Sequence, residues 1–141
     1  MAGLAMGAFG MIQSLLSGKG LMNPLRLIGF TFQPFFEAPE KNKGIIAVGL
    51  LIHVAMSMIA GVVFILFVNM LNTARKLLWI WGPLYATFIW LFLQFGILRM
   101  LNPEMAAQIN QPVFLLSHLV FGTVIGGYVA SQLHKNDMNK M

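Results

Sequence analysis

The sequence predicts an all-α membrane protein: four transmembrane helices arranged as two hairpins, with short interfacial helices, in a single domain of 141 residues. Hydrophobic residues make up 58% of the chain and charged residues only 9%, whereas a soluble domain is about 25% charged. Long stretches carry no charge, and none alternates with the period of two that a membrane β-barrel strand requires. Too few charges remain to cover a water-facing surface, so lipid must cover much of it.

The first predicted span covers residues 2–17 and is short, with Gly18 directly behind it as a helix stop. The next apolar stretch, residues 23–36, opens on Asn23-Pro24, which predicts an N-cap followed by proline at the first helical position. This stretch is too short to cross a hydrocarbon core of about 30 Å, so we expect it to lie in the membrane interface.

Three longer spans are predicted at residues 44–71, 83–101 and 112–133. Each has close to or more than the roughly 20 apolar residues that a transmembrane helix needs. Pro83 is expected to start or kink the second of these spans. Asn102 and the proline after it repeat the helix-start signal and predict a short helix before the last span.

The formal charge of +5 comes from basic residues that stand beside the predicted spans. This placement indicates anchoring to lipid headgroups and does not favour nucleic-acid binding. Four spans would put both termini on the same side of the membrane. The count of basic residues does not decide the side, and we expect cytoplasmic termini in the inner (plasma) membrane because the first long loop is more aromatic than basic.

A repeated pattern relates the spans at 44–71 and 112–133. Aligning LIHVAMSMIAG with LSHLVFGTVIG superposes the two histidines and the small residues four and eight positions later. Residues four apart share one helix face, and small residues there let helix backbones approach closely. The pattern predicts two hairpins related by a rough two-fold axis along the membrane normal, with chance similarity between apolar helices as the alternative. The predicted packing residues are Gly49, Ser57, Gly61, Gly122, Gly126 and Ala130.

His53 and His118 are the only ionisable residues near the middle of any predicted span, which makes them the first functional candidates. Both lie at a similar depth along their helices, on the side where Arg99 ends the third span. Two neutral imidazoles could hold haem b, with Arg99 beside a propionate, although close-packed glycine faces oppose insertion of a haem. A quinone or lipid-headgroup site, a proton-linked role, and hydrogen bonding of each ring to a serine, Gln94 or a carbonyl are the alternatives.

The sequence contains no pattern that is typical of an enzyme. Cysteine is absent, which removes thiolate chemistry and disulfides. No carboxylate pair is placed for acid–base catalysis, because the four acidic residues lie in predicted loops or in the tail. The eleven methionines form no single stripe, and no phosphate-binding glycine loop is present. We expect neither catalytic residues nor a metal site.

Three stretches resemble the YagU-like family of uncharacterised small four-helix bacterial inner-membrane proteins. They are the opening AGLAMGAFGMIQSLL with the following MNPLRLIGF, the central LLIHVAMSMIAGVVFILF and the closing SHLVFGTVIGGYV. The resemblance implies four spans and no established chemistry. The chain departs from the family pattern in its longer aromatic loop, residues 21–36, and in the aromatic entry at residues 79–83.

The hypothesis that best fits these features is a non-catalytic integral membrane subunit, a structural or accessory component of a larger membrane protein complex. The chain has little water-soluble mass, several small-residue faces and an apolar interfacial segment that could contact a partner. The expected partners are the lipid bilayer and other membrane protein subunits or further copies of the chain. A bis-histidine haem b electron-transfer subunit and a small transporter or channel are the two alternatives.

Overall fold

The computed structural model describes residues 1–31, 44–71 and 74–138, and all regular structure in these ranges is helical. The all-α class predicted from composition is therefore confirmed. The elements are α1 Ala2–Leu16, α2 Asn23–Gly29, α3 Gly44–Met70, the 3-10 turn η2 Arg75–Leu77, α4 Leu78–Phe92, the π-helical turn η3 Leu93–Ile97, α5 Leu98–Leu101, α6 Pro103–Gln108 and α7 Gln111–Met138.

Three helical stretches of the described chain are long and apolar enough to cross a membrane: Gly44–Met70, Arg75–Leu101 and Gln111–Leu133. They correspond to the three longer spans predicted from the sequence, with the first ending one residue earlier than predicted. The remaining apolar helix, α1, has 15 residues. At 1.5 Å per residue it extends about 22 Å, which is less than a hydrocarbon core of about 30 Å. Gly18 follows α1 with a positive φ of 72°, as expected for a residue that stops a helix.

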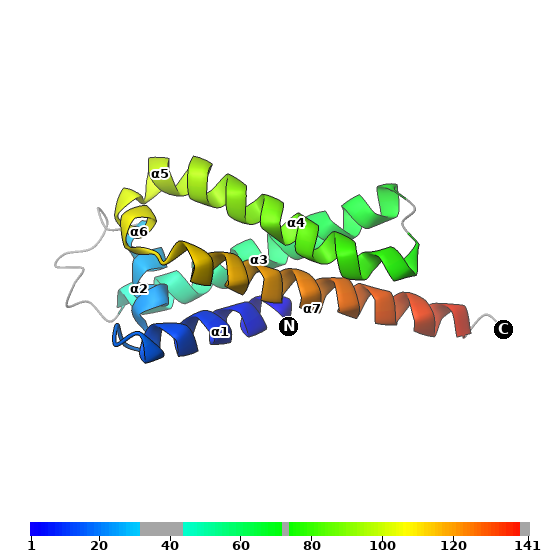
Figure 1. The fold of residues 1–141 in the computed structure, drawn as a ribbon, viewed down its shortest axis with the longest axis horizontal. Coiled ribbons are helices and arrows are strands. Elements are labelled where there is room, and N and C mark those ends of the chain that lie inside the picture. The colour runs from blue at the N-terminus through cyan, green and yellow to red at the C-terminus, as the bar shows by residue number, and fades with distance from the viewer. Residues whose placement is uncertain (32–43, 72–73, 139–141) are drawn as a thin grey trace.

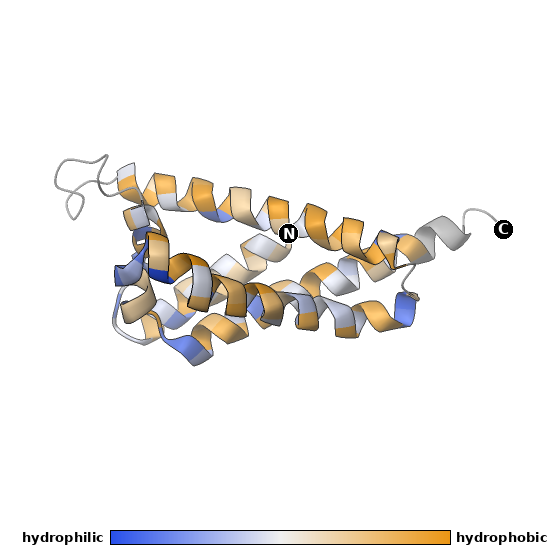
Figure 2. Cartoon of the chain, turned by 90° about the horizontal axis from the view of Figure 1, so that it is seen from above, coloured by the Kyte–Doolittle hydropathy of each residue, from blue (hydrophilic) through white to orange (hydrophobic). Residues whose placement is uncertain are grey.

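The long helices form an elongated bundle whose polar residues gather at its two ends (Figure 2). α3 and α7 run in the same direction, and α1 and α4 run opposite to them (Figure 1). α4 packs along α7, whereas α1 packs on α7 and α3 only in the half of the bundle that holds α2 and α6. α2 crosses that end and packs on α3. α1 therefore lies against α3 and α7 in one half of the bundle only.

Two of the predicted helix starts have different outcomes. Asn102 is an N-cap, because its Oδ1 atom accepts a hydrogen bond of 2.9 Å from the backbone N–H of Met105. Asn23 is not an N-cap, and this prediction was wrong: the cap is Met22, and Asn23 is already the first helical residue. The N–H of Asn23 donates to the carbonyl of Gly20, so the chain is wound into a turn before Asn23 and its side chain has no capping role.

The third predicted span begins earlier than expected. Helix α4 starts at Leu78, directly after η2, so Pro83 lies inside the helix and does not start it. Proline removes one backbone hydrogen bond near the start of a helix, and the packing of α4 along α7 outweighs that loss. The π-helical turn Leu93–Ile97, which was not predicted, interrupts the same span and buries Gln94. At the other end of the chain, α7 continues past the predicted limit of residue 133 to Met138.

Helices α4 and α7 approach each other closely in the core. A Cβ atom placed on Gly122 would overlap the carbonyl oxygen of Gly82, and one placed on Gly126 would overlap the carbonyl of Leu78. These positions bring the two backbones together at the centre of the hydrophobic core. The buried core residues are Phe64, Val68, Leu78, Ala86, Phe121, Ile125 and Ala130.

Polar tie points connect elements that lie far apart in the sequence. The side-chain amide of Asn102 donates a hydrogen bond of 2.7 Å to the carbonyl of Leu27 and one of 2.9 Å to the hydroxyl of Thr31. These bonds fix α2 against the start of α6. Leu25 and Leu27 are buried, so the part of the predicted interfacial segment that is described packs onto the bundle end. Residues 32–36 of that segment lie outside the described residues.

Candidate functional site

His53 on α3 forms a hydrogen bond across the bundle to α1. Its Nε2 atom donates to the carbonyl oxygen of Gly3 at 2.9 Å. A carbonyl oxygen only accepts, so Nε2 carries the proton. A Cβ atom on Gly7 would lie 3.0 Å from the same ring nitrogen, so the imidazole packs directly against the glycine face of α1.

His118 on α7 is 2% exposed and bonds within its own helix. Its Nδ1 atom donates to the carbonyl of Phe114 at 2.8 Å, and the two rings meet edge to face at 4.5 Å between centroids. Both histidines thus donate to carbonyl oxygens, one across the bundle and one to the preceding turn.

The haem hypothesis needs both imidazoles and Arg99 around one cavity. One cavity lies between α3 and α7 and another at the end of the bundle that holds α2 and α6; His53 borders both, and His118 borders neither. Arg99 also borders neither, and its guanidinium carbon lies 5.3 Å from the ring centroid of Phe95. Neither of these two cavities therefore brings together the residues that a bis-histidine haem needs, and the haem hypothesis stays a prediction. The described ranges also contain no group of three or more His, Cys, Asp or Glu side chains placed to hold a metal.

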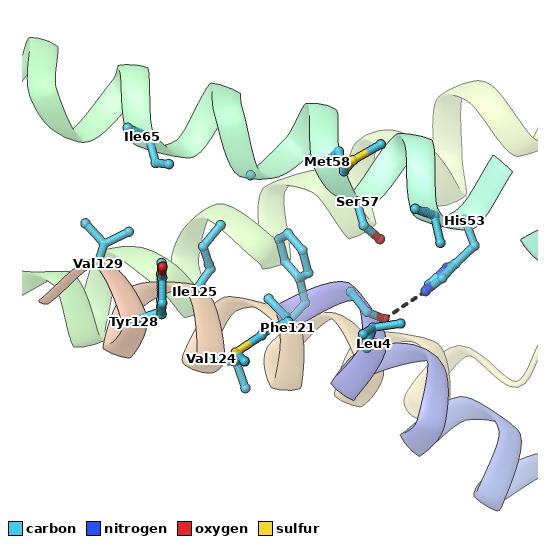
Figure 3. A pocket seen from close by; sticks show the side chains of 15 residues that line it. Leu4, His53, Ser57, Met58, Ile65, Phe121, Val124, Ile125, Tyr128 and Val129 are labelled. Atoms are coloured by element: carbon cyan, nitrogen blue, oxygen red, sulfur yellow. Dashed lines mark hydrogen bonds between the residues drawn. The ribbon is translucent and has the colours of Figure 1, made fainter. Parts of the chain in front are cut away.

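The larger cavity is a groove of about 560 Å³ between α3 and α7, which we call the α3/α7 groove. The groove begins at His53, where the first turn of α1 closes one end of it. From there it continues along α3 and α7 away from α1 (Figure 3). On the other side of His53, α1 itself packs against α3 and α7. The groove residues that come from α3 and α7, in addition to His53, are Val54, Ser57, Met58, Gly61, Ile65, Phe121, Val124, Ile125, Tyr128 and Val129.

The hydroxyl groups of the three long helices distinguish this groove from the rest of the bundle. Five of them donate to carbonyls of the chain itself. Ser57 and Tyr128 are the two in the described part of these helices that make no such bond, and both line the groove. The five paired residues are Tyr85, Thr87, Ser117, Thr123 and Ser131.

The small residues predicted to form packing seams lie in different environments. Gly49 faces α2, where a Cβ atom would overlap the carbonyl of Leu25. Ser57 contacts Gly3 of α1. A Cβ atom on Gly61 would meet only Ile125 Cδ1, at 3.5 Å, and Gly61 lines the groove. The α7 members of the pattern, Gly122, Gly126 and Ala130, are buried, and both glycines pack against α4.

Sequence reasoning did not find Tyr128, and it considered Ser57 only as a packing residue or as a hydrogen-bond partner of a histidine. A tyrosine on an apolar helix gives no sign of whether its hydroxyl has a partner, because that depends on which helix lies opposite. The available signal was the alignment of the two histidine helices, in which Ser57 and Gly61 correspond to Gly122 and Gly126.

No protein-family model, curated protein or solved structure matches this chain. The YagU-like resemblance therefore remains a prediction based on the three stretches that carry it.

Proposed function

We propose that this chain is a non-catalytic integral membrane subunit and that its α3/α7 groove holds a transmembrane helix of a partner subunit. The observation that carries the proposal is a pair of hydroxyl groups, those of Ser57 and Tyr128, that line the groove and bond to none of the described residues. A hydroxyl without a hydrogen-bond partner in hydrocarbon is unfavourable. A second polypeptide in the groove would remove that cost.

The internal repeat supports a helix as the occupant. In the alignment of α3 with α7, Gly61 corresponds to Gly126 and Ile65 corresponds to Ala130. Gly126 packs against α4, and Ala130 is buried in the core. Gly61 and Ile65 instead line the open groove. The two α7 positions are thus covered, whereas the corresponding positions of α3 are open.

The depth of Ser57 supports protein over phospholipid as the occupant. Residue 57 is the middle of α3, which runs from residue 44 to residue 70. The polar groups of a phospholipid lie at the membrane surface, and its acyl chains offer no hydrogen-bond partner at this depth. A transmembrane helix can present a polar side chain there.

The same proposal retains four membrane segments, with α1 as the fourth, in the inner membrane and with cytoplasmic termini. Three helices have the length and composition to cross. The 15 residues of α1 extend about 22 Å, so its insertion requires the bilayer beside it to thin locally.

Hydroxyl deletions test the groove in native membranes. Ser57→Ala and Tyr128→Phe each remove one donor, and Thr123→Val removes an exposed α7 hydroxyl that already bonds to Leu119 and lies outside the groove. A hydrogen bond in a membrane is worth on the order of 0.6 kcal/mol, so each groove variant should weaken partner retention about three-fold. The measurement is the fraction of the chain found in a larger complex by native electrophoresis and native mass spectrometry after mild detergent extraction.

We expect the double variant to weaken retention of the partner about nine-fold and Thr123→Val to leave it unchanged. Equal retention by all variants would contradict the proposal. A complex made only of copies of this chain would replace the partner subunit with a second copy, and a monomer that carries only lipid would replace it with lipid; either result overturns the proposal as stated.

A further inference from the structure

A second cavity, of about 190 Å³, lies at the end of the bundle where α1 stops and where α2, α6 and α7 meet. Its wall changes character with depth. Lys19, Ser17 and Ser14 line the outer part, at the level where the long helices begin or end, and Gly10 and His53 line the inner part. Polar residues also gather at this end of the bundle (Figure 2). The cavity is thus polar at headgroup level and less polar toward the membrane interior.

We propose that this cavity, which we call the Lys19 cavity, binds the phosphate group of an anionic phospholipid through the ammonium of Lys19. The Nζ atom of Lys19 donates a hydrogen bond of 3.2 Å to the carbonyl oxygen of Gln108, which holds the side chain against the end of α6. An ammonium has three N–H donors, so two remain for a ligand. Within the described residues no carboxylate pairs with Lys19.

The first turn of α7 strengthens the attraction for an anion. Asn110 and Val113 line the cavity, and the side chain of Asn110 caps the N–H of Val113 at 3.2 Å. The N-terminus of a 28-residue helix therefore stands at the cavity wall. Its partial positive charge adds to the charge of Lys19.

The hydroxyl groups of the cavity favour an anionic ligand over a neutral one. Ser14 donates to the carbonyl of Gly20 at 2.8 Å, and Ser117 donates to the carbonyl of Val113 at 2.9 Å. With these two donors used, the hydroxyl of Ser17 and the ammonium of Lys19 remain in the outer part of the cavity. The charged amine is the stronger of the two donors, and it favours a phosphate oxygen over a quinone carbonyl. The volume is below the roughly 300 Å³ at which drug-sized ligand pockets begin, so the cavity accommodates the headgroup region and the acyl chains lie outside it.

The test uses the full-length protein purified in detergent and mixed with phosphatidylglycerol, phosphatidylcholine or inorganic phosphate. Native mass spectrometry counts the retained molecules. Lys19→Gln removes the charge, Lys19→Arg keeps it, and Arg26→Ala removes an exposed cation on α2 that does not border the cavity. One basic residue near an anionic surface is worth about five-fold in affinity.

We expect one phosphatidylglycerol to be retained by the wild type, Lys19→Arg and Arg26→Ala, and to bind about five-fold more weakly to Lys19→Gln. Gly10→Leu should also release it, because a Cβ atom there meets only Ser117 Oγ, at 3.7 Å, and the rest of the side chain enters the cavity.

Equal retention by Lys19→Gln and the wild type would overturn the proposal, as would equal retention of phosphatidylcholine or an equal loss in Arg26→Ala. Displacement of the lipid by millimolar inorganic phosphate would show that the site binds phosphate without recognising a lipid. None of these results depends on the α3/α7 groove, whose occupant is measured separately.

Discussion

The Nε2 atom of His53 on α3 lies 2.9 Å from the carbonyl oxygen of Gly3 on α1, a contact between residues 50 positions apart in the sequence. At this point the N-terminal end of α1 meets the start of the α3/α7 groove (Figure 3). An intramembrane histidine is a cofactor candidate by default. Here its ring positions the short helix that closes one end of the groove.

Replacing His53 with alanine should loosen α1 from α3. The lost hydrogen bond is expected to lower the free energy of unfolding by about 0.6 kcal/mol, and the lost ring contact with Gly7 adds to that value. Unfolding in mixed micelles by increasing fractions of SDS measures the change. Thr123→Val is the control, and an unchanged stability of His53→Ala would show that the contact does not hold α1 in place.

Glycine-to-alanine substitutions at two positions of α3 should differ in how much they lower stability. Gly49→Ala places a methyl group on the carbonyl of Leu25, a backbone atom that cannot rotate away, and overpacking of this kind costs about 1–3 kcal/mol. Gly61→Ala meets only Ile125 Cδ1, at 3.5 Å, and should change stability by less than about 0.5 kcal/mol. The same SDS titration compares them. Equal effects would mean that α2 does not approach α3 as closely as described.

Protein purified from haem-replete cells is expected to show no Soret absorption that requires both histidines. The physical reason is that neither the α3/α7 groove nor the Lys19 cavity is bordered by both rings. An absorption spectrum provides the measurement. A Soret band in the wild type that disappears in both His53→Ala and His118→Ala would contradict this prediction and restore the electron-transfer hypothesis.

The proposed orientation predicts which ends of the bundle react from outside the cell. The chain contains no cysteine, so single cysteines can be introduced at Lys19 and Lys76, which lie near opposite ends of the bundle. A membrane-impermeant maleimide added to intact spheroplasts should label Lys19→Cys and leave Lys76→Cys unlabelled. The reverse pattern would invert the orientation and place the termini outside.

The sequence was sufficient to predict the fold class and most of the helices. The long uncharged stretches at residues 44–71 and 112–133 predicted α3 and α7, because helix is the structure that satisfies the backbone of a single chain in lipid. Asn102 predicted a helix start because its side chain acts locally. Asn23-Pro24 also predicted the start of α2. The capping role of Asn23 was wrong, because the turn that begins at Gly20 makes Met22 the cap.

The groove could not be predicted from the sequence, because it follows from a difference in length between helices that pack at equivalent positions. α4 covers the face of Gly126, whereas α1 stops before Gly61. Periodicity shows that a face carries small residues but not which helix lies on it. For the same reason, the sequence did not indicate that Gly49 would pack against α2.

Photo-crosslinking from the groove tests the central claim most directly. A photoreactive phenylalanine replaces Ile65 inside the groove or Phe88 on the exposed face of α4 outside it. We predict that Ile65 crosslinks in native membranes to one membrane protein of a different sequence, that Gly61→Leu abolishes this product, and that Phe88 yields only lipid adducts. Lipid adducts alone at Ile65, or adducts that consist only of this chain, would contradict the claim that the α3/α7 groove holds a helix of a partner subunit.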